Sequence, residues 1–131
     1  MHIEVTRQVL TALAREAADT YPAECCGILL GEGTRIAAIL PAANVHPAPR
    51  THFEIDPQTL IDAHRAARGG GPQVLGYYHS HPSGTPEPSV EDAAMAARDG
   101  SIWAIIGQGK TAFWHDTAAG FAPLSCCIVG S

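Results

Sequence analysis

Two histidines and an aspartate have the residue types and the spacing that suit metal chemistry. His79 and His81 stand two positions apart at the end of a stretch that is typical of a β-strand. Side chains two apart on a strand point to the same face, so both imidazoles can bind one ion. Asp92 follows in the first turn of an expected helix. Two histidines, one carboxylate and an open coordination position are typical of a catalytic zinc site.

Each of these features also has an interpretation without a metal. The two histidines could form polar surface at a strand end, because the His-x-His motif is short. Ser89 and Asp92 fit a helix start, where a hydroxyl caps free amides and an acidic residue is favoured. The two interpretations of this turn are compatible, since a capping turn would fix the position of a ligand carboxylate. Glu87 and Glu91 remain alternative third ligands.

A general base that is not a metal ligand would complete a hydrolytic site, and Glu24 is the candidate. This residue immediately precedes the apolar run 25–31. At the start of a buried strand an unpaired carboxylate is unfavourable, and this favours a functional reason for its presence. The alternative is a glutamate in an exposed loop, which is where most glutamates lie.

The hydrophobic pattern predicts the elements that position these residues. Apolar residues recur at helical spacing after Thr6, an expected N-cap, until Tyr21 and Pro22 end the helix. Asp56 and Pro57 favour the start of a second helix that ends at the glycines 69–71. An alanine-rich third helix is expected over residues 89–99. The expected strands are 25–31, 35–40, 73–81, 102–106, 112–115 and 121–129.

This order of elements predicts an α/β fold, a mixed β-sheet packed by helices. No internal repeat and no long linker interrupts the 131 residues, so residues 1–131 are expected to form a single domain.

The composition excludes several classes of protein. Eight Lys and Arg residues against 13 Asp and Glu residues give a net charge of −5, and the basic residues are scattered. A nucleic-acid partner is therefore not expected. No apolar run approaches the roughly 20 residues of a membrane-spanning helix, and the sequence does not begin with a signal segment. We expect a cytoplasmic protein with no membrane partner.

Four cysteines occur as two adjacent pairs, Cys25 with Cys26 and Cys126 with Cys127. Their spacing matches neither a C-x-x-C metal hook nor the disulfide framework of a secreted protein. The first interpretation is that all four are small core hydrophobes. A cross-link between the pairs is the alternative if their strands are neighbours.

The residues named above together resemble the JAMM (MPN+) zinc metalloprotease family, in particular its small stand-alone prokaryotic members. The signature of this family is an upstream Glu, then His-x-His, seven residues, Ser, two residues and Asp. Glu24, His79, His81, Ser89 and Asp92 match it at every position. Segments 22–31 and 82–84 are also similar to the family, and the order of elements agrees from residue 6 to about residue 107.

The resemblance implies a cytidine deaminase-like fold, that of a JAMM/MPN+ metalloprotease domain. It implies that His79, His81 and Asp92 bind one Zn²⁺, that Glu24 activates the attacking water and that Ser89 stabilises the oxyanion. Deaminase chemistry itself is not expected, because the H-x-E and P-C-x-x-C ligands of those enzymes are absent from the sequence.

Similarity to small bacterial members implies a zinc metallopeptidase that acts on a ubiquitin-like sulfur-carrier protein. The bond expected to be hydrolysed is the amide after the C-terminal glycine of the carrier. A non-catalytic MPN scaffold, or a metal-binding module in a protein assembly, is the alternative. A metal- or thiol-handling protein that uses the cysteine pairs is another, as is a DNA-repair-associated branch of the superfamily. The oligomeric state is left open, with a homodimer as one alternative.

Overall fold

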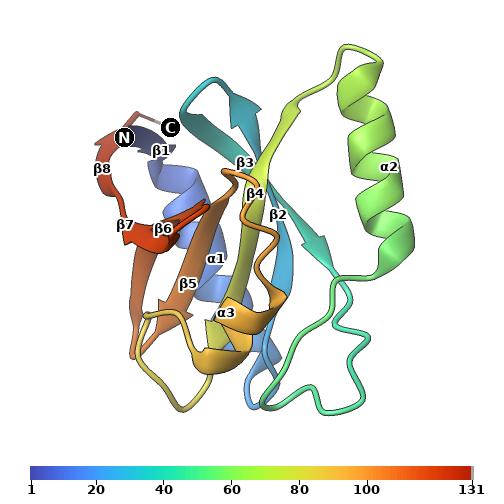
Figure 1. Ribbon diagram of the computed structural model, residues 1–131, viewed down its shortest axis with the longest axis vertical. Helices are drawn as coiled ribbons and strands as arrows, with labels where there is room; N and C mark the ends of the chain where they lie inside the picture. The colour runs from blue at the N-terminus through green and yellow to red at the C-terminus, as the bar shows by residue number, and fades with distance from the viewer. Residues whose placement is uncertain (131) are drawn as a thin grey trace.

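A computed structural model describes residues 1–130 as one curled β-sheet with three helices packed on it (Figure 1). Along the chain the elements are β1 (His2–Thr6), α1 (Arg7–Thr20), β2 (Cys26–Glu32), β3 (Arg35–Ala42), α2 (Pro57–Arg68), β4 (Gln73–His81), α3 (Val90–Met95), β5 (Ile102–Gly107), β6 (Lys110–Thr117), β7 (Gly120–Pro123) and β8 (Ser125–Val129). Within residues 1–130 there is no helix with the length and apolar character needed to span a bilayer.

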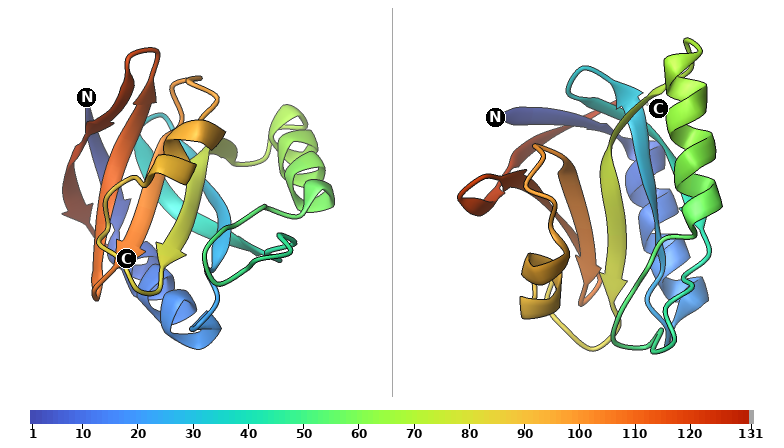
Figure 2. Two further views of the ribbon diagram at one scale, coloured as in Figure 1. Left: turned by 60° about the horizontal axis from the view of Figure 1, so that its bottom comes forward. Right: turned by 45° about the vertical axis from the view of Figure 1, so that its right-hand side comes forward.

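The sheet has eight strands in the order β7-β6-β5-β4-β2-β3-β1-β8. Pairing is parallel between β4 and β5, β1 and β3, and β1 and β8, and antiparallel elsewhere. Strands β7 and β8 stand at opposite ends of this order, although only Leu124 separates them along the chain. The sheet must therefore curl so that its two edge strands come together at this residue. Figure 2 shows the curled sheet. The expected mixed sheet is confirmed, whereas the expected single strand 121–129 is wrong.

Alternation along the strands divides the core into two layers, one on each face of the sheet. Helix α1 covers the face behind the sheet in Figure 1, and α3 lies on the front face. Side chains of consecutive residues therefore lie in different layers, as those of Cys25 and Cys26 do. The layer under α1 includes Ile3, Val9, Leu13, Cys25, Leu29, Tyr78 and Phe113. The other layer is formed by Cys26, Phe53, Ile55 and Trp103, with Leu60 and Tyr77 partly buried against them.

The first two helices lie where the sequence predicts them. The Thr6 hydroxyl accepts a hydrogen bond from the Val9 N–H at 3.3 Å, which caps α1. Pro57 occupies the first turn of α2, where its missing N–H has no cost. Strand β1 was not among the expected elements, although buried Ile3 and Val5 alternate with His2 and Glu4 in the pattern of a strand.

Helix α3 is shorter than the expected helix 89–99, because a tertiary contact overrides the helix propensity of its alanines. The chain becomes extended at Ala96, where φ is −64° and ψ is 130°. Arg98 has a φ of 56°, and its N–H donates to the buried Asp116 Oδ2 at 3.0 Å. Ala96 packs against the layer that contains Trp103. Anchoring by Asp116 on β6 thus ends the helix early.

The cysteine pairs differ in their surroundings. Cys25 and Cys26 are buried, as expected, but Cys126 and Cys127 are exposed on β8, so the core interpretation is wrong for this pair. All four are free thiols. Strands β2 and β8 are separated by β3 and β1, which places the two pairs too far apart for the alternative cross-link.

Candidate metal centre

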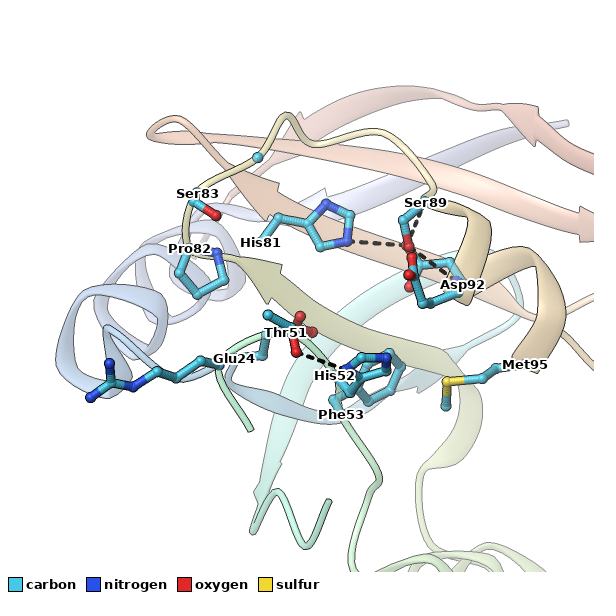
Figure 3. A pocket seen from close by; sticks show the side chains of 13 residues that line it. Glu24, Thr51, His52, Phe53, His81, Pro82, Ser83, Ser89, Asp92 and Met95 are labelled. Atoms are coloured by element: carbon cyan, nitrogen blue, oxygen red, sulfur yellow. Dashed lines mark hydrogen bonds and ion pairs between the residues drawn. The ribbon is translucent and has the colours of Figure 1, made fainter. Parts of the chain in front are cut away.

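The C-terminal end of β4 and the start of α3 bring three potential ligands together. His79 Nε2 lies 3.0 Å from Asp92 Oδ1, and His81 Nε2 lies 3.1 Å from Asp92 Oδ2. The two Nε2 atoms are 3.1 Å apart. One ligand atom from each of the three residues falls within 4.8 Å of the others. Figure 3 shows His81 and Ser89 pointing toward Asp92. The structure thus assembles the set that spacing alone suggested.

Local structure fixes each member of this cluster. β4 is an interior strand, and His79 is paired with Cys26 on β2 and with Ile105 on β5. At the start of α3 a capping box holds the carboxylate. The Asp92 N–H donates to Ser89 Oγ at 3.0 Å, and the Ser89 N–H donates to Asp92 Oδ2 at 2.9 Å. The helix-start and ligand interpretations of this turn are therefore compatible in the structure.

Hydrogen bonding orients His81 as a ligand. Its Nδ1 lies 2.8 Å from the Thr85 carbonyl oxygen, to which it donates its proton. In a neutral imidazole the other nitrogen, Nε2, then carries a lone pair. That lone pair faces His79 Nε2 and an Asp92 oxygen. Electron-rich atoms at such short distances repel one another unless a cation lies between them. The donor set therefore fits a divalent transition metal, with Thr85 as the outer partner that orients a ligand.

His79 and Asp92 are almost completely buried, with 1% and 3% of their surfaces exposed. The His79 ring stacks on Phe53 at a centroid distance of 4.2 Å and meets Trp103 edge-on at 5.6 Å. Burial lowers the pKa of His79 and so favours the neutral imidazole that binds metals. Burial acts to raise the pKa of Asp92, but the adjacent imidazoles of His79 and His81 hold that pKa below its usual range.

Glu24 lies two residues before β2 and lines the same pocket as His81, Ser89 and Asp92, a pocket of about 280 Å³. It does not belong to the three-ligand cluster. Its side chain is buried, and burial raises its pKa to about 7, with His81 acting to lower it and Asp92 to raise it. A carboxylate with such a pKa beside a metal site can accept and return a proton near neutral pH.

The two alternative third ligands do not join the cluster. Glu87 and Glu91 are exposed, and neither belongs to the group of converging ligand atoms. Glu91 lines the catalytic pocket without entering that group.

Asn44 is a residue of the site that the sequence interpretation treated only as part of a loop. Its amide nitrogen donates to the carbonyl oxygens of Glu24, Pro49 and His52 at 3.1, 3.4 and 3.0 Å. Its carbonyl oxygen accepts from the N–H groups of His46 and Glu54, both at 3.1 Å. One side chain thus ties Glu24 to the loop that lines the pocket. No spacing signal marks this role, because its partners are backbone atoms distant in sequence.

Fold and site together define a metallohydrolase-like domain, and the comparisons with known proteins place it in a family. A family model for prokaryotic homologs of the JAB domain matches residues 6–117, so the chain belongs to this family. The resemblance drawn from the sequence is confirmed.

Several similar proteins carry names that describe an activity. The chain is 33% identical over 126 residues to the desampylase of Haloferax volcanii, covering 93% of this chain and 91% of that protein. It is 39% identical over 84 residues to a probable TtuB-protein conjugate cleaving protease of Thermus thermophilus, covering 64% of this chain and 53% of that protein.

Two solved structures support the fold. A protein from Desulfitobacterium hafniense superposes with a TM-score of 0.85 at 24% identity, covering 100% of this chain and 94% of that one. A structure described as a JAMM metalloprotease-like zinc site in the proteasome and signalosome has a TM-score of 0.61 at 18% identity, with 97% and 99% covered. Both agree with the α/β architecture expected from the sequence.

Proposed function

We propose that this protein is a zinc-dependent isopeptidase that hydrolyses the amide bond after the C-terminal glycine of a ubiquitin-like sulfur-carrier protein. The observation that carries the proposal is the convergence of His79, His81 and Asp92 in a pocket that also contains Glu24. A Zn²⁺ ion bound by these three residues would supply Lewis acidity, which would lower the pKa of water and polarise the scissile carbonyl group.

Glu24 is proposed as the general base. Its carboxylate takes a proton from the attacking water and then returns that proton to the leaving amine, so that one residue serves both steps. Burial of this side chain, which raises its pKa to about 7, supports both roles. No covalent intermediate with the protein is needed, because water is the nucleophile.

Ser89 is proposed to stabilise the tetrahedral oxyanion. In the capping box its Oγ accepts a hydrogen bond from the Asp92 N–H. Acceptance uses a lone pair of Oγ, so the hydroxyl proton remains free to be donated to a substrate oxygen. Ser89 can therefore cap α3 and act as a donor at once. A donor of this kind contributes about 3 kcal/mol to transition-state stabilisation.

The substrate class is supported by the names of the relatives. The Haloferax volcanii protein is named a desampylase, and the Thermus thermophilus protein is named for cleaving conjugates of the protein TtuB. The first of these is matched over almost its whole length. We extend this activity class to the present chain on the basis of the shared family and the assembled site.

Mass spectrometry of candidate carriers tests the proposal. Ubiquitin-like sulfur carriers with a C-terminal extension are incubated with zinc-loaded protein, and Glu24→Gln serves as the control that keeps the ligands. We expect loss of the extension with the wild type only. If zinc is bound and no carrier is cleaved, the proposed substrate class is wrong, and the non-catalytic scaffold becomes the better interpretation.

A further inference from the structure

A second pocket of about 350 Å³ adjoins the catalytic pocket. The two share Phe53 and Met95 in their walls, so a chain bound at the metal centre can continue into this second pocket. An extended peptide advances roughly 3.3 Å per residue. Contacts in the second pocket would therefore be made by a side chain a few residues from the scissile bond.

The lining of the second pocket combines apolar walls with acidic groups. Ile55, Leu60, Tyr77 and Trp103 belong to its apolar part. Its acidic residues are Glu54, Asp99 and Asp116, and the lining contains no lysine, arginine or histidine of the described chain. Apolar walls with acidic groups suit a side chain that has an aliphatic stem and a cationic end.

Asp116 provides the most specific indication of a ligand. Only 1% of its surface is exposed. Its Oδ2 accepts the Arg98 N–H at 3.0 Å, but its Oδ1 has no hydrogen-bond partner among residues 1–130. Leaving a buried carboxylate oxygen unpaired is costly, so such an atom usually has a partner. A donor from a bound ligand would supply the missing hydrogen bond.

We propose that this second pocket binds an arginine side chain of the substrate tail, with Asp116 as the group that recognises it. The inference rests on the proposed function, because it assumes that a peptide tail occupies the adjoining catalytic pocket. A guanidinium group offers five donors in a plane, and it stacks on aromatic rings such as those of Tyr77 and Trp103. Lysine carries the same charge, but its ammonium group has no planar surface that could stack on these rings.

Binding to the Glu24→Gln protein tests this inference independently of turnover. Tail peptides carry a single arginine, which is moved through the positions on both sides of the scissile glycine bond. Citrulline, the neutral isostere of arginine, and lysine replace it in matched peptides. We expect arginine at one position to lower Kd about tenfold relative to citrulline, with lysine in between, as measured by titration calorimetry.

The Asp116→Asn change isolates the recognising atom. Its amide oxygen can still accept from the Arg98 N–H, whereas its NH₂ group replaces the unpaired Oδ1 with a donor. We expect this change to abolish the preference for arginine over citrulline. Glu32→Gln is the matched control, since it removes one negative charge at the exposed far end of β2, and it should leave the preference intact.

The outcomes separate this inference from the proposed function. The inference is wrong if the peptides do not bind or if they bind without a preference for arginine over citrulline. It is also wrong if this preference survives Asp116→Asn in a protein whose circular dichroism spectrum is unchanged. Cleavage of carriers by the wild type without any arginine preference would leave the proposed function standing alone. If the peptides show an arginine preference but the zinc-loaded wild type cleaves no carrier, the proposed function is wrong and the proposal that the second pocket binds arginine stands.

Discussion

Replacement of Asn44 by alanine offers a direct test of how the catalytic pocket is held together. The substitution removes five hydrogen bonds at once, three to carbonyl oxygens and two from backbone N–H groups. Each such bond contributes about 0.5–1.5 kcal/mol net, and those groups that regain water recover part of the loss. We expect the free energy of unfolding to fall by about 3–5 kcal/mol, measured by urea denaturation.

The catalytic consequence of the same change should be separable from the loss of stability. None of the hydrogen bonds of Asn44 involves the three metal ligands, but one of them holds the carbonyl group of Glu24. Zinc stoichiometry should therefore be retained in the folded Asn44→Ala protein, while kcat falls at least tenfold because the base is displaced.

Two further variants serve as controls for Asn44→Ala. Asn44→Asp keeps both acceptor bonds but places a carboxylate against three carbonyl oxygens. At neutral pH it should lower the free energy of unfolding at least as much as Asn44→Ala does, and at acidic pH it should lower it less. Gln58→Ala removes an exposed amide that donates only to Asp62 at 2.8 Å, and it should cost under about 0.5 kcal/mol. A loss below about 1 kcal/mol for Asn44→Ala would refute the central role of this amide.

Glu24, the metal and Ser89 can each be tested separately. Burial raises the pKa of Glu24 to about 7, and the carboxylate is the form that acts as a base. We therefore expect log(kcat/KM) to rise with pH up to about 7 and then to level off, with the bend at a lower pH if the bound cation lowers this pKa. A value of kcat/KM that is independent of pH from 5 to 8 would contradict the assignment. Removal of zinc by a chelator should lower Tm, since at a thousandfold excess over Kd the metal stabilises by about 4 kcal/mol; an unchanged Tm in calorimetry would argue against the site. Ser89→Ala should cost about 1 kcal/mol of stability through the lost cap and reduce kcat about a hundredfold. Ser125→Ala removes an exposed hydroxyl of β8 that lies 3.0 Å from His2 Nδ1, and it should leave kcat unchanged and cost under about 0.5 kcal/mol.

Much of the metal centre could be predicted because its geometry is local. His79 and His81 share a face through the period of a strand, and Ser89 and Asp92 are joined by a capping box within one helical turn. The hydrophobic pattern also predicted the strand 73–81 that holds the two histidines. Glu24 is different, since its approach to the cluster depends on the pairing of β2 with β4. Its place before the apolar run 25–31 and the family signature indicated it, and spacing relative to the ligands did not.

Other features arise only from contacts between distant segments. The alanines after Met95 have high helix propensity, yet Asp116 binds the Arg98 N–H and ends the helix. The same residue lines the pocket beside the metal centre, and its buried Oδ1 has no hydrogen-bond partner among residues 1–130. Likewise, the backbone partners of Asn44 have no sequence signature.

The sequence by itself determined the two histidines that share a face of β4, the helix start that carries Asp92 and most of the strands, because each depends on spacing within one element. Tertiary structure alone decided the strand order, the separation of β7 from β8 at Leu124 and the pocket that contains Asp116. The physical reason is that side-chain periodicity encodes which face a residue occupies but not which distant strand or loop packs against that face.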